Sequence, residues 1–318
     1  VGARVQNWNA NARAGASEYV IIEADEYQNK LKRYHPRGAI ITNVDFDHPD
    51  VVQELKDWGL WYVNETEAQL NKRLIQKNWP NGTKLSIYPK KRRGEEIIIS
   101  MKLPTGDLNS LNHSATAFGF IAPMLDLGNS KYAKEEISVK LDELKSSIYF
   151  SSSAGSFGIN IKTDKTNLAE TLTLLTELLA YPTFPEKELA VMKRSAIAAI
   201  EAKRKDPSSV ALDGLRATLY NYPKGHPSEA LSADEKIAAI NATTTKQLAD
   251  LYQQHFSVNH GFISIIGDVN ADELSSQLQK HLKAFNKDVP YKIIKSAYHQ
   301  IEGEIKTYQA PDKANAEL

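Results

Sequence analysis

Acidic side chains and a histidine gather at residues 45–50, within the stretch TNVDFDHPD, which follows a short apolar run. Carboxylate oxygens are hard ligands that suit Mg²⁺ and, through the metal, the oxygens of a phosphate group. A second acidic stretch, EADE at 23–26, also ends an apolar run. Side chains of these types at the ends of two strands predict a metal or phosphate site.

Two apolar runs would have to position these side chains. The runs EYVIIEADE and RGAIITNV are rich in β-branched residues. Continuous runs of this kind are typical of strands that are buried in a parallel sheet. We therefore expect a short α/β segment over residues 1–50, with the acids at one edge of its sheet.

The bulk composition excludes several classes of protein. The 318 residues include 39 basic and 39 acidic side chains, so no net charge favours nucleic acid or an anionic membrane as partner. No cysteine is present, which excludes disulfides and thiolate zinc ligands. No apolar run approaches membrane-spanning length, and the start VGARVQNWNA lacks a Met and a signal-peptide core. We expect a soluble piece of a longer protein, from the cytoplasm or the periplasm.

The rest of the chain alternates between strand and helix patterns. Residues 51–80 read as a polar connector that ends in the turn signal WPNG. Strands are predicted for KLSIY, EEIIISMKL, SSIYFSSS, SFGINIKT and HGFISIIGDVN, with PKKRRG as a hairpin turn between the first two. Helices are predicted at 113–127, 134–146, from Asn167 with a leucine stripe, after YPTFPEKE, at 208–220, and after the capping residues Ser232, Thr244 and Asn270. This order predicts an α+β domain: one sheet with helices grouped on a face.

The first 50 residues resemble the central, ATP-binding domain of Mur ligases, which add amino acids during peptidoglycan synthesis. NARAGASEYVIIEADEY, HPRGAIITNV and DFDHPD carry the resemblance. It implies that Glu23 and His48, with Asn43 beside them, are positions that hold Mg²⁺ near ATP phosphates. The phosphate loop G-x-x-x-x-G-K-S/T is missing from the chain. We therefore expect a truncated segment whose inherited magnesium positions are idle.

Residues 81–318 resemble the pitrilysin/insulinase family of zinc metallopeptidases. The resemblance is spread over NGTKLSIYPKKRRGEE, MLDLGNSKYAKEEISVKLDELKSSI, TDKTNLAETLTLLTELLAYPTFPEKELAVMKRS, KDPSSVALDGL, NYPKGHP and TTTKQLADLYQQHFSVNHGFISIIGDVNADEL. It implies four similar α+β domains, paired as two halves that enclose an unfolded peptide. Zinc in the first half is held by H-x-x-E-H and a distant Glu, while the inner Glu activates water.

The zinc-ligand positions of that family carry other residues in this chain. Aligned on MLDLG, the two His positions fall at Gly119 and Pro123, and the motif Glu falls at Ala122. The distant Glu falls near Ala198 or Ala199. The resemblance therefore implies the second, non-zinc half of the family, with residues 81–290 as its third domain and 291–318 as a linker and the start of a further domain.

Other chemically capable residues favour structural interpretations. His113, His255, His260 and His281 are too dispersed for a zinc pair, and His255 continues a buried helical stripe. The basic run 90–93 reads as a solvated turn. SSSAGSFG lacks the G-x-S-x-G order of a nucleophile elbow. Any peptide contact would use exposed strand edges, by strand addition.

The leading hypothesis is a non-catalytic half of a pitrilysin/insulinase-type peptidase, which forms part of the peptide-enclosing chamber. Its expected partners are the zinc-bearing half or subunit and a peptide, with no cofactor in this chain. One alternative is an ATP-dependent Mur-type amide ligase fragment. Another is an inactive scaffold subunit of a two-chain peptidase. The join of two families predicts a gene fusion or an assembly artefact, with its seam around residues 49–65.

Overall fold

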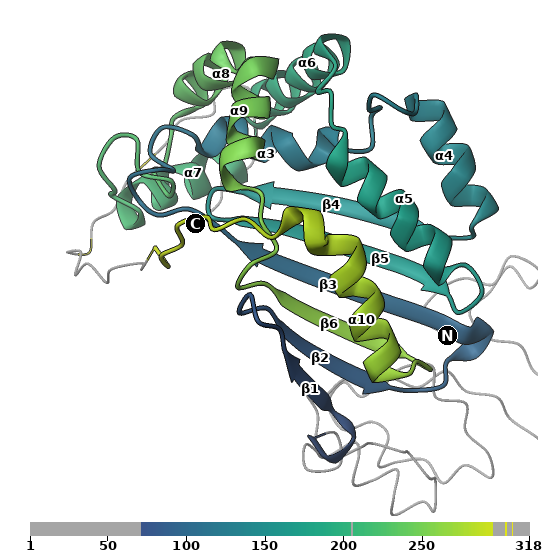
Figure 1. Ribbon diagram of the computed structural model, residues 1–318. Helices are drawn as coiled ribbons and strands as arrows, with labels where there is room; N and C mark the ends of the chain where they lie inside the picture. Colours follow the sequence, from purple (N-terminus) through teal and green to yellow (C-terminus); the bar gives the residue numbers. More distant parts are fainter. Residues whose placement is uncertain (1–70, 205, 295–302, 304–306, 308–318) are drawn as a thin grey trace, which may run out of the picture. The chain divides into compact units, whose positions relative to one another are not determined.

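The computed structural model describes residues 71–204, 206–294, 303 and 307. The described chain is coloured along its length in Figure 1. Glu23, Asn43 and His48 lie outside the described residues, as does nearly all of the strand expected in GEIKTYQA.

A single mixed sheet of six strands forms the centre of the domain (Figure 1). The strands are β1 (Ile75–Asn78), β2 (Lys84–Pro89), β3 (Glu96–Pro104), β4 (Ser147–Ser153), β5 (Ser156–Asp164) and β6 (Phe262–Gly267). Their order across the sheet is β1-β2-β6-β3-β5-β4, and only the β2–β6 pair is parallel. The predicted α+β class with one sheet is confirmed.

Strand register aligns the apolar side chains into rows that run across the sheet. One row joins Ile87, Ile265, Ile99, Ile161 and Ile148, all of them buried. The neighbouring row on the same face joins Leu85, Ile263, Met101, Ile159 and Phe150, which are also buried. Each such side chain stabilises the fold by roughly 1.5–3 kcal/mol through burial, so the two rows form the main part of the core.

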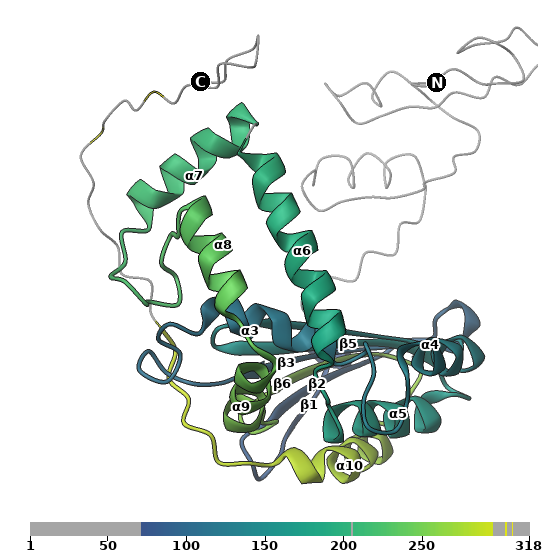
Figure 2. The same cartoon turned by 90° about the horizontal axis from the view of Figure 1, so that it is seen from above.

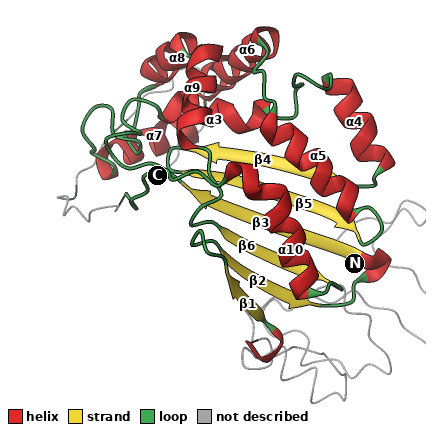
Figure 3. Ribbon diagram, viewed as in Figure 1, coloured by secondary structure: helices red, strands yellow, loops and turns green. Residues whose placement is uncertain are grey.

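Helices cover the face that carries these rows (Figure 3). The helical elements are η2 (Arg93–Glu95), α3 (Ala115–Ile121), η3 (Ala122–Met124), α4 (Lys134–Glu143), α5 (Leu168–Ala180), α6 (Glu186–Lys203), α7 (Pro207–Leu219), α8 (Ala233–Ala242), α9 (Thr245–His255), α10 (Ala271–Leu282) and η4 (Lys283–Phe285). Figure 2 shows α5 and α10 on one side of the sheet, whereas α6, α7 and α8 extend on the other side, beyond its margin.

The predicted leucine stripe of α5 is confirmed. Leu168, Leu172, Leu175 and Leu179 are all buried against the sheet, because residues at these spacings lie on one face of a helix. The predicted caps also form. Ser232 and Glu235 make the reciprocal bonds of a capping box, and the Thr244 hydroxyl accepts from the backbone N–H of Gln247.

The hairpin predicted between β2 and β3 is wrong. β6 lies between them, and the backbone N–H of Lys90 donates to the carbonyl of Gly267 at 3.0 Å, across the end of β6. Local sequence patterns suggest that consecutive strands pair. The partner that separates β2 from β3 comes more than 150 residues later in the chain, so no local pattern reveals it.

The range 51–80, interpreted as a connector, contributes β1 to the sheet. β1 pairs with β2 from Ile75↔Ile87 to Asn78↔Lys84. The turn signal WPNG joins the two strands, and the N–H of Gly82 donates to the carbonyl of Trp79. Trp79 is buried, and its indole N–H donates to Ser275 Oγ on α10 at 3.1 Å.

Candidate functional site

The strand β4 forms one edge of the described sheet. Within the described residues β4 pairs with β5 on one side and with no strand on the other. A free strand edge presents unpaired N–H and C=O groups, which can pair with an added peptide strand. Tyr149 is 66% exposed on this strand, so a large side chain is also available beside the edge.

Ser152 ties this edge strand to the helical segment that follows Ser114. Its Oγ donates to the carbonyl of Phe118 at 2.6 Å and accepts from the N–H of Ala122 at 3.0 Å. These two peptide groups are four residues apart, so an uninterrupted α-helix would bond them to each other. A hydroxyl inserted at this point explains why α3 ends at Ile121 and continues as the 3₁₀ turn η3.

The residues at the expected zinc positions stand in this same segment. Gly119 lies on the exposed side of α3, Ala122 is buried beside Ser152, and Pro123 lies in η3. A Cβ placed on Gly119 would meet no atom within 4 Å. Packing therefore does not force a glycine at this position, and a larger side chain would fit. Ala198 and Ala199 lie on exposed positions of α6.

Metal-binding side chains do not gather elsewhere in the part of the chain that the structure describes. Among those residues, no group of three or more His, Cys, Asp or Glu side chains could hold a metal ion. The described helices also include none that is long and apolar enough to cross a membrane.

His255 is the most deeply buried of the histidines singled out from the sequence. It ends α9, is 3% exposed, and neither ring nitrogen has a hydrogen-bond partner. The ring meets the edge of Phe118, with 5.6 Å between ring centroids. Burial lowers the pKa of the His255 imidazole, because the charged form would lose its hydration. The predicted burial at the helix end is therefore confirmed.

The other histidines make local contacts. His281 lies beside Thr176 with Nδ1 and Oγ1 3.1 Å apart, and burial lowers its pKa as well. His260 is exposed and packs against Gly82. His113 is exposed, as expected for a surface residue, and its backbone N–H donates to the carbonyl of Gly225 at 2.8 Å.

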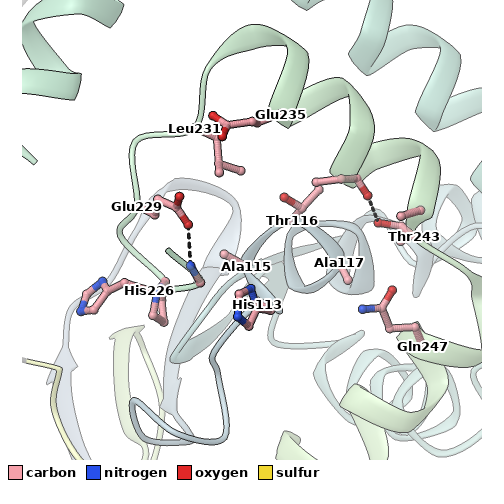
Figure 4. Close-up of a pocket in the computed structure, with 14 residues that line it drawn as sticks. His113, Ala115, Thr116, Ala117, His226, Glu229, Leu231, Glu235, Thr243 and Gln247 are labelled. Carbon is pink, nitrogen blue, oxygen red and sulfur yellow. Dashed lines mark hydrogen bonds between the residues drawn. The ribbon is translucent and has the colours of Figure 1, made fainter. Parts of the chain in front are cut away.

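A pocket of about 250 Å³ lies beside His113 (Figure 4). It is lined by the first turn of α3, the loop 225–231, α8 and the start of α9. The two carboxylates that line the pocket accept hydrogen bonds from nearby backbone groups. Glu229 accepts from the backbone N–H of Gly225 at 2.6 Å, and Glu235 caps α8. Gly225 has φ +84°, and a Cβ there would lie 2.4 Å from the His113 ring. These contacts fix the loop against α3.

The sequence interpretation missed both the pocket and the role of Ser152. The pocket joins segments more than 100 residues apart, and NYPKGHP reads only as a loop. A signal for Ser152 did exist. Ile148 and Phe150 are buried, and Ser152 has the same parity in the strand, which places its hydroxyl on the helix-covered face.

Comparison with known proteins gives two separate likenesses. No protein-family model matches the chain. A stretch of 57 residues is 44% identical to the UDP-N-acetylmuramate–L-alanine ligase of Thermosynechococcus vestitus, covering 18% of this chain and 12% of the ligase. The same ligase of a Cyanothece strain is 43% identical over 56 residues, again 18% and 12% of the two chains. The chain thus spans only a small part of these curated relatives.

The likeness in structure is to M16 peptidases. The inactive domain of a peptidase M16 from Pseudomonas fluorescens matches with a TM-score of 0.57 and 18% identity, over 71% of this chain and 53% of that chain. A protease from Helicobacter pylori matches with a TM-score of 0.57 and 15% identity, over the same shares. The periplasmic protease PqqL from Escherichia coli matches with a TM-score of 0.56 and 17% identity, over 73% of this chain and 26% of that chain.

These likenesses confirm the two resemblances. The described domain has the fold of M16 peptidase domains, and a short stretch resembles a Mur ligase. The identities to the solved structures are low, so they show the fold alone. The chain spans about half of the first two of these structures and a quarter of PqqL.

Replacing Ser152 with Ala tests the link between β4 and α3. Loss of the hydroxyl leaves the carbonyl of Phe118 and the N–H of Ala122 without this partner. We expect the free energy of unfolding to fall by about 1–2 kcal/mol, measured by urea denaturation. Ser153→Ala, an exposed serine on the same strand, should change it by less than about 0.5 kcal/mol. Equal losses in both variants would contradict the assigned role.

Buried His255 predicts an acid-sensitive stability. Its pKa is lowered in the folded state, so below pH 6.5 the unfolded chain binds a proton that the folded chain does not. Stability should be full above pH 6.5 and decline below it, by at most about 1.4 kcal/mol per pH unit for one such group.

Urea denaturation at pH 7 and pH 5 measures this decline. His255→Phe keeps a ring and removes the titrating group, so the decline should become smaller. His281, whose pKa is also lowered, accounts for a remaining part. His260→Asn removes an exposed imidazole and serves as the control. An unchanged decline in His255→Phe would refute the assignment.

Proposed function

We propose that this chain serves as a non-catalytic half of an M16-type zinc peptidase and forms one wall of the chamber that encloses the peptide. The observation that carries the proposal is the link from the free edge of β4, through Ser152, to the α3–η3 segment. That segment is where the family's zinc ligands would fall, and it carries Gly119, Ala122 and Pro123 instead. The strand edge remains, while the groups that would hold zinc and activate water are replaced.

Strand addition at β4 supplies the peptide contact in this proposal. A two-residue turn, Ala154–Gly155, joins β4 to β5, with Ser153 opposite Ser156. Such a turn is closed by a hydrogen-bonded pair, and hydrogen-bonded and non-bonded pairs alternate from there. The peptide groups of Ile148, Phe150 and Ser152 therefore face away from β5. An added strand would bind them without regard to its sequence, which suits a chamber wall that holds varied peptides.

Alternating N-methylation of a bound peptide tests strand addition. Two versions of a peptide with alternating apolar and polar residues, which fixes the register, would carry N-methyl groups at odd or even positions. We expect one version to bind with at least tenfold lower affinity than the other, measured by fluorescence anisotropy, because its methyl groups block the hydrogen bonds to β4. The other version, methylated on the far edge, is the matched control. Equal affinities, or no peptide binding at all, would reject the proposed edge.

Zinc titration tests the non-catalytic assignment separately. Gly119, Ala122 and Pro123 have no side-chain atom that could bind a metal ion. We expect the full chain to take up far less than one equivalent of zinc in isothermal titration, and to leave a quenched peptide intact with zinc present. A tight one-to-one site accompanied by hydrolysis would overturn the assignment.

A Mur-type ligase fragment is the second candidate, because 57 residues are 44% identical to a ligase. That stretch makes up 12% of the ligase, and the chain contains no G-x-x-x-x-G-K-S/T phosphate loop. We therefore expect that a fluorescent ATP analogue will not bind in the presence of Mg²⁺ with a Kd below about 1 mM. A Kd of this size corresponds to a binding free energy of about −4 kcal/mol. Micromolar binding that Glu23→Gln weakens would favour the ligase instead.

An inactive scaffold subunit of a two-chain peptidase shares every feature above with the leading proposal. It differs only in whether the zinc-bearing half is a separate chain. Stoichiometric co-purification with an H-x-x-E-H protein would support the scaffold.

A further inference from the structure

The turn between β1 and β2 contains Asn81 followed by Gly82, the one Asn-Gly pair in the chain. In such a pair the backbone nitrogen of the glycine can attack the side-chain amide carbon of the asparagine, because glycine has no Cβ to hinder the approach. A bond forms from Gly82 N to Asn81 Cγ, and Nδ2 leaves as ammonia together with the proton of the Gly82 N–H. Water then opens the resulting succinimide ring at either carbonyl, which gives aspartate or isoaspartate.

The fold holds the attacking nitrogen in place. The N–H of Gly82 donates to the carbonyl of Trp79 at 3.0 Å and closes the turn. Gly82 has φ +81°, and a Cβ there would lie 2.5 Å from Nδ1 of His260, so the imidazole packs closely against this residue. Attack on Asn81 requires the Gly82 nitrogen to lose its proton and turn toward Cγ. The bond to Trp79 therefore opposes the reaction.

The amide of Asn81 is held as well. Its Nδ2 donates to Oδ1 of Asn259 at 3.2 Å and to Oδ1 of Asn286 at 2.8 Å, and its Oδ1 accepts from the N–H of Thr83 at 3.1 Å. The backbone carbonyl of Asn81 accepts from the N–H of His260 at 3.2 Å. These contacts join the turn to the loop before β6 and to the residue that ends η4. The amide has to break them before it can rotate toward Gly82.

We propose that Asn81 is a deamidation site whose reactivity is controlled by opening of the β1–β2 turn. Gly82 is exposed, so water reaches the pair, and in the open turn Asn81 reacts as it would in an unfolded chain. The products do not restore the original contacts. An aspartate carboxylate has no N–H to donate to Asn259 and Asn286, and isoaspartate lengthens the main chain of the turn by a methylene group. Each conversion thus weakens the contact of the turn with these two asparagines. The site does not depend on the peptidase role.

Peptide mapping by mass spectrometry gives the first test, on the full chain kept at mildly alkaline pH. We expect Asn81 to convert at least about tenfold more slowly in the native chain than in guanidinium chloride, because only the open fraction of native molecules reacts. Chromatography separates the aspartate and isoaspartate forms of the peptide. Equal rates in the two states, or no conversion of Asn81 in guanidinium chloride, would overturn the proposal.

Replacing the two acceptors of Nδ2 gives the second test. Asn259→Ala combined with Asn286→Ala should speed the native conversion of Asn81 by about fivefold or more, since two hydrogen bonds no longer oppose opening. The rate in guanidinium chloride should not change, because the sequence around Asn81 is the same. Asn160→Ala is the matched control. It removes an amide that accepts from Ser100 at 2.8 Å on other strands of the sheet, and it should leave the rate at Asn81 unchanged.

Circular dichroism checks that each variant is folded. If the double variant is unfolded, Asn286→Ala alone, which removes the shorter of the two bonds, takes its place in the comparison. A native rate at Asn81 equal to that of the wild type in the folded variant, or an equal increase in Asn160→Ala, would refute the role of the amide contacts.

Discussion

The pairing of β6 with both β2 and β3 is the constraint on which the rest of the domain depends. β6 comes from the far end of the described chain, yet it occupies the middle of the sheet, parallel to β2 and antiparallel to β3. Ile263 and Ile265 of β6 complete the two buried rows. Without β6, the β1–β2 hairpin would have no partner strand in the sheet. The two ends of the domain therefore become stable together.

The position of β6 also determines which strands form the two edges of the described sheet. With β6 in the centre, β1 and β4 become the outer strands. β1 has four residues, whereas β4 has seven and is tied through Ser152 to α3. A short edge strand offers few unpaired groups, which protects it against unwanted pairing. Within the described sheet, the longer β4 edge therefore offers more unpaired backbone groups than β1, and Ser152 fixes this strand to α3.

Local signals in the sequence predicted most of the elements and little of their arrangement. Alternating runs predicted β4 and β5, and the leucine stripe predicted α5, because both patterns arise within one element. The strand β6 itself was predicted, but its position between β2 and β3 was not, and neither was the strand β1, since both depend on partners far along the chain. The same limit applies to the site. The resemblance assigns the expected zinc positions to Gly119, Ala122 and Pro123 from sequence alone, and this assignment stays a prediction. The bond between Ser152 and Ala122 exists only once two distant segments meet.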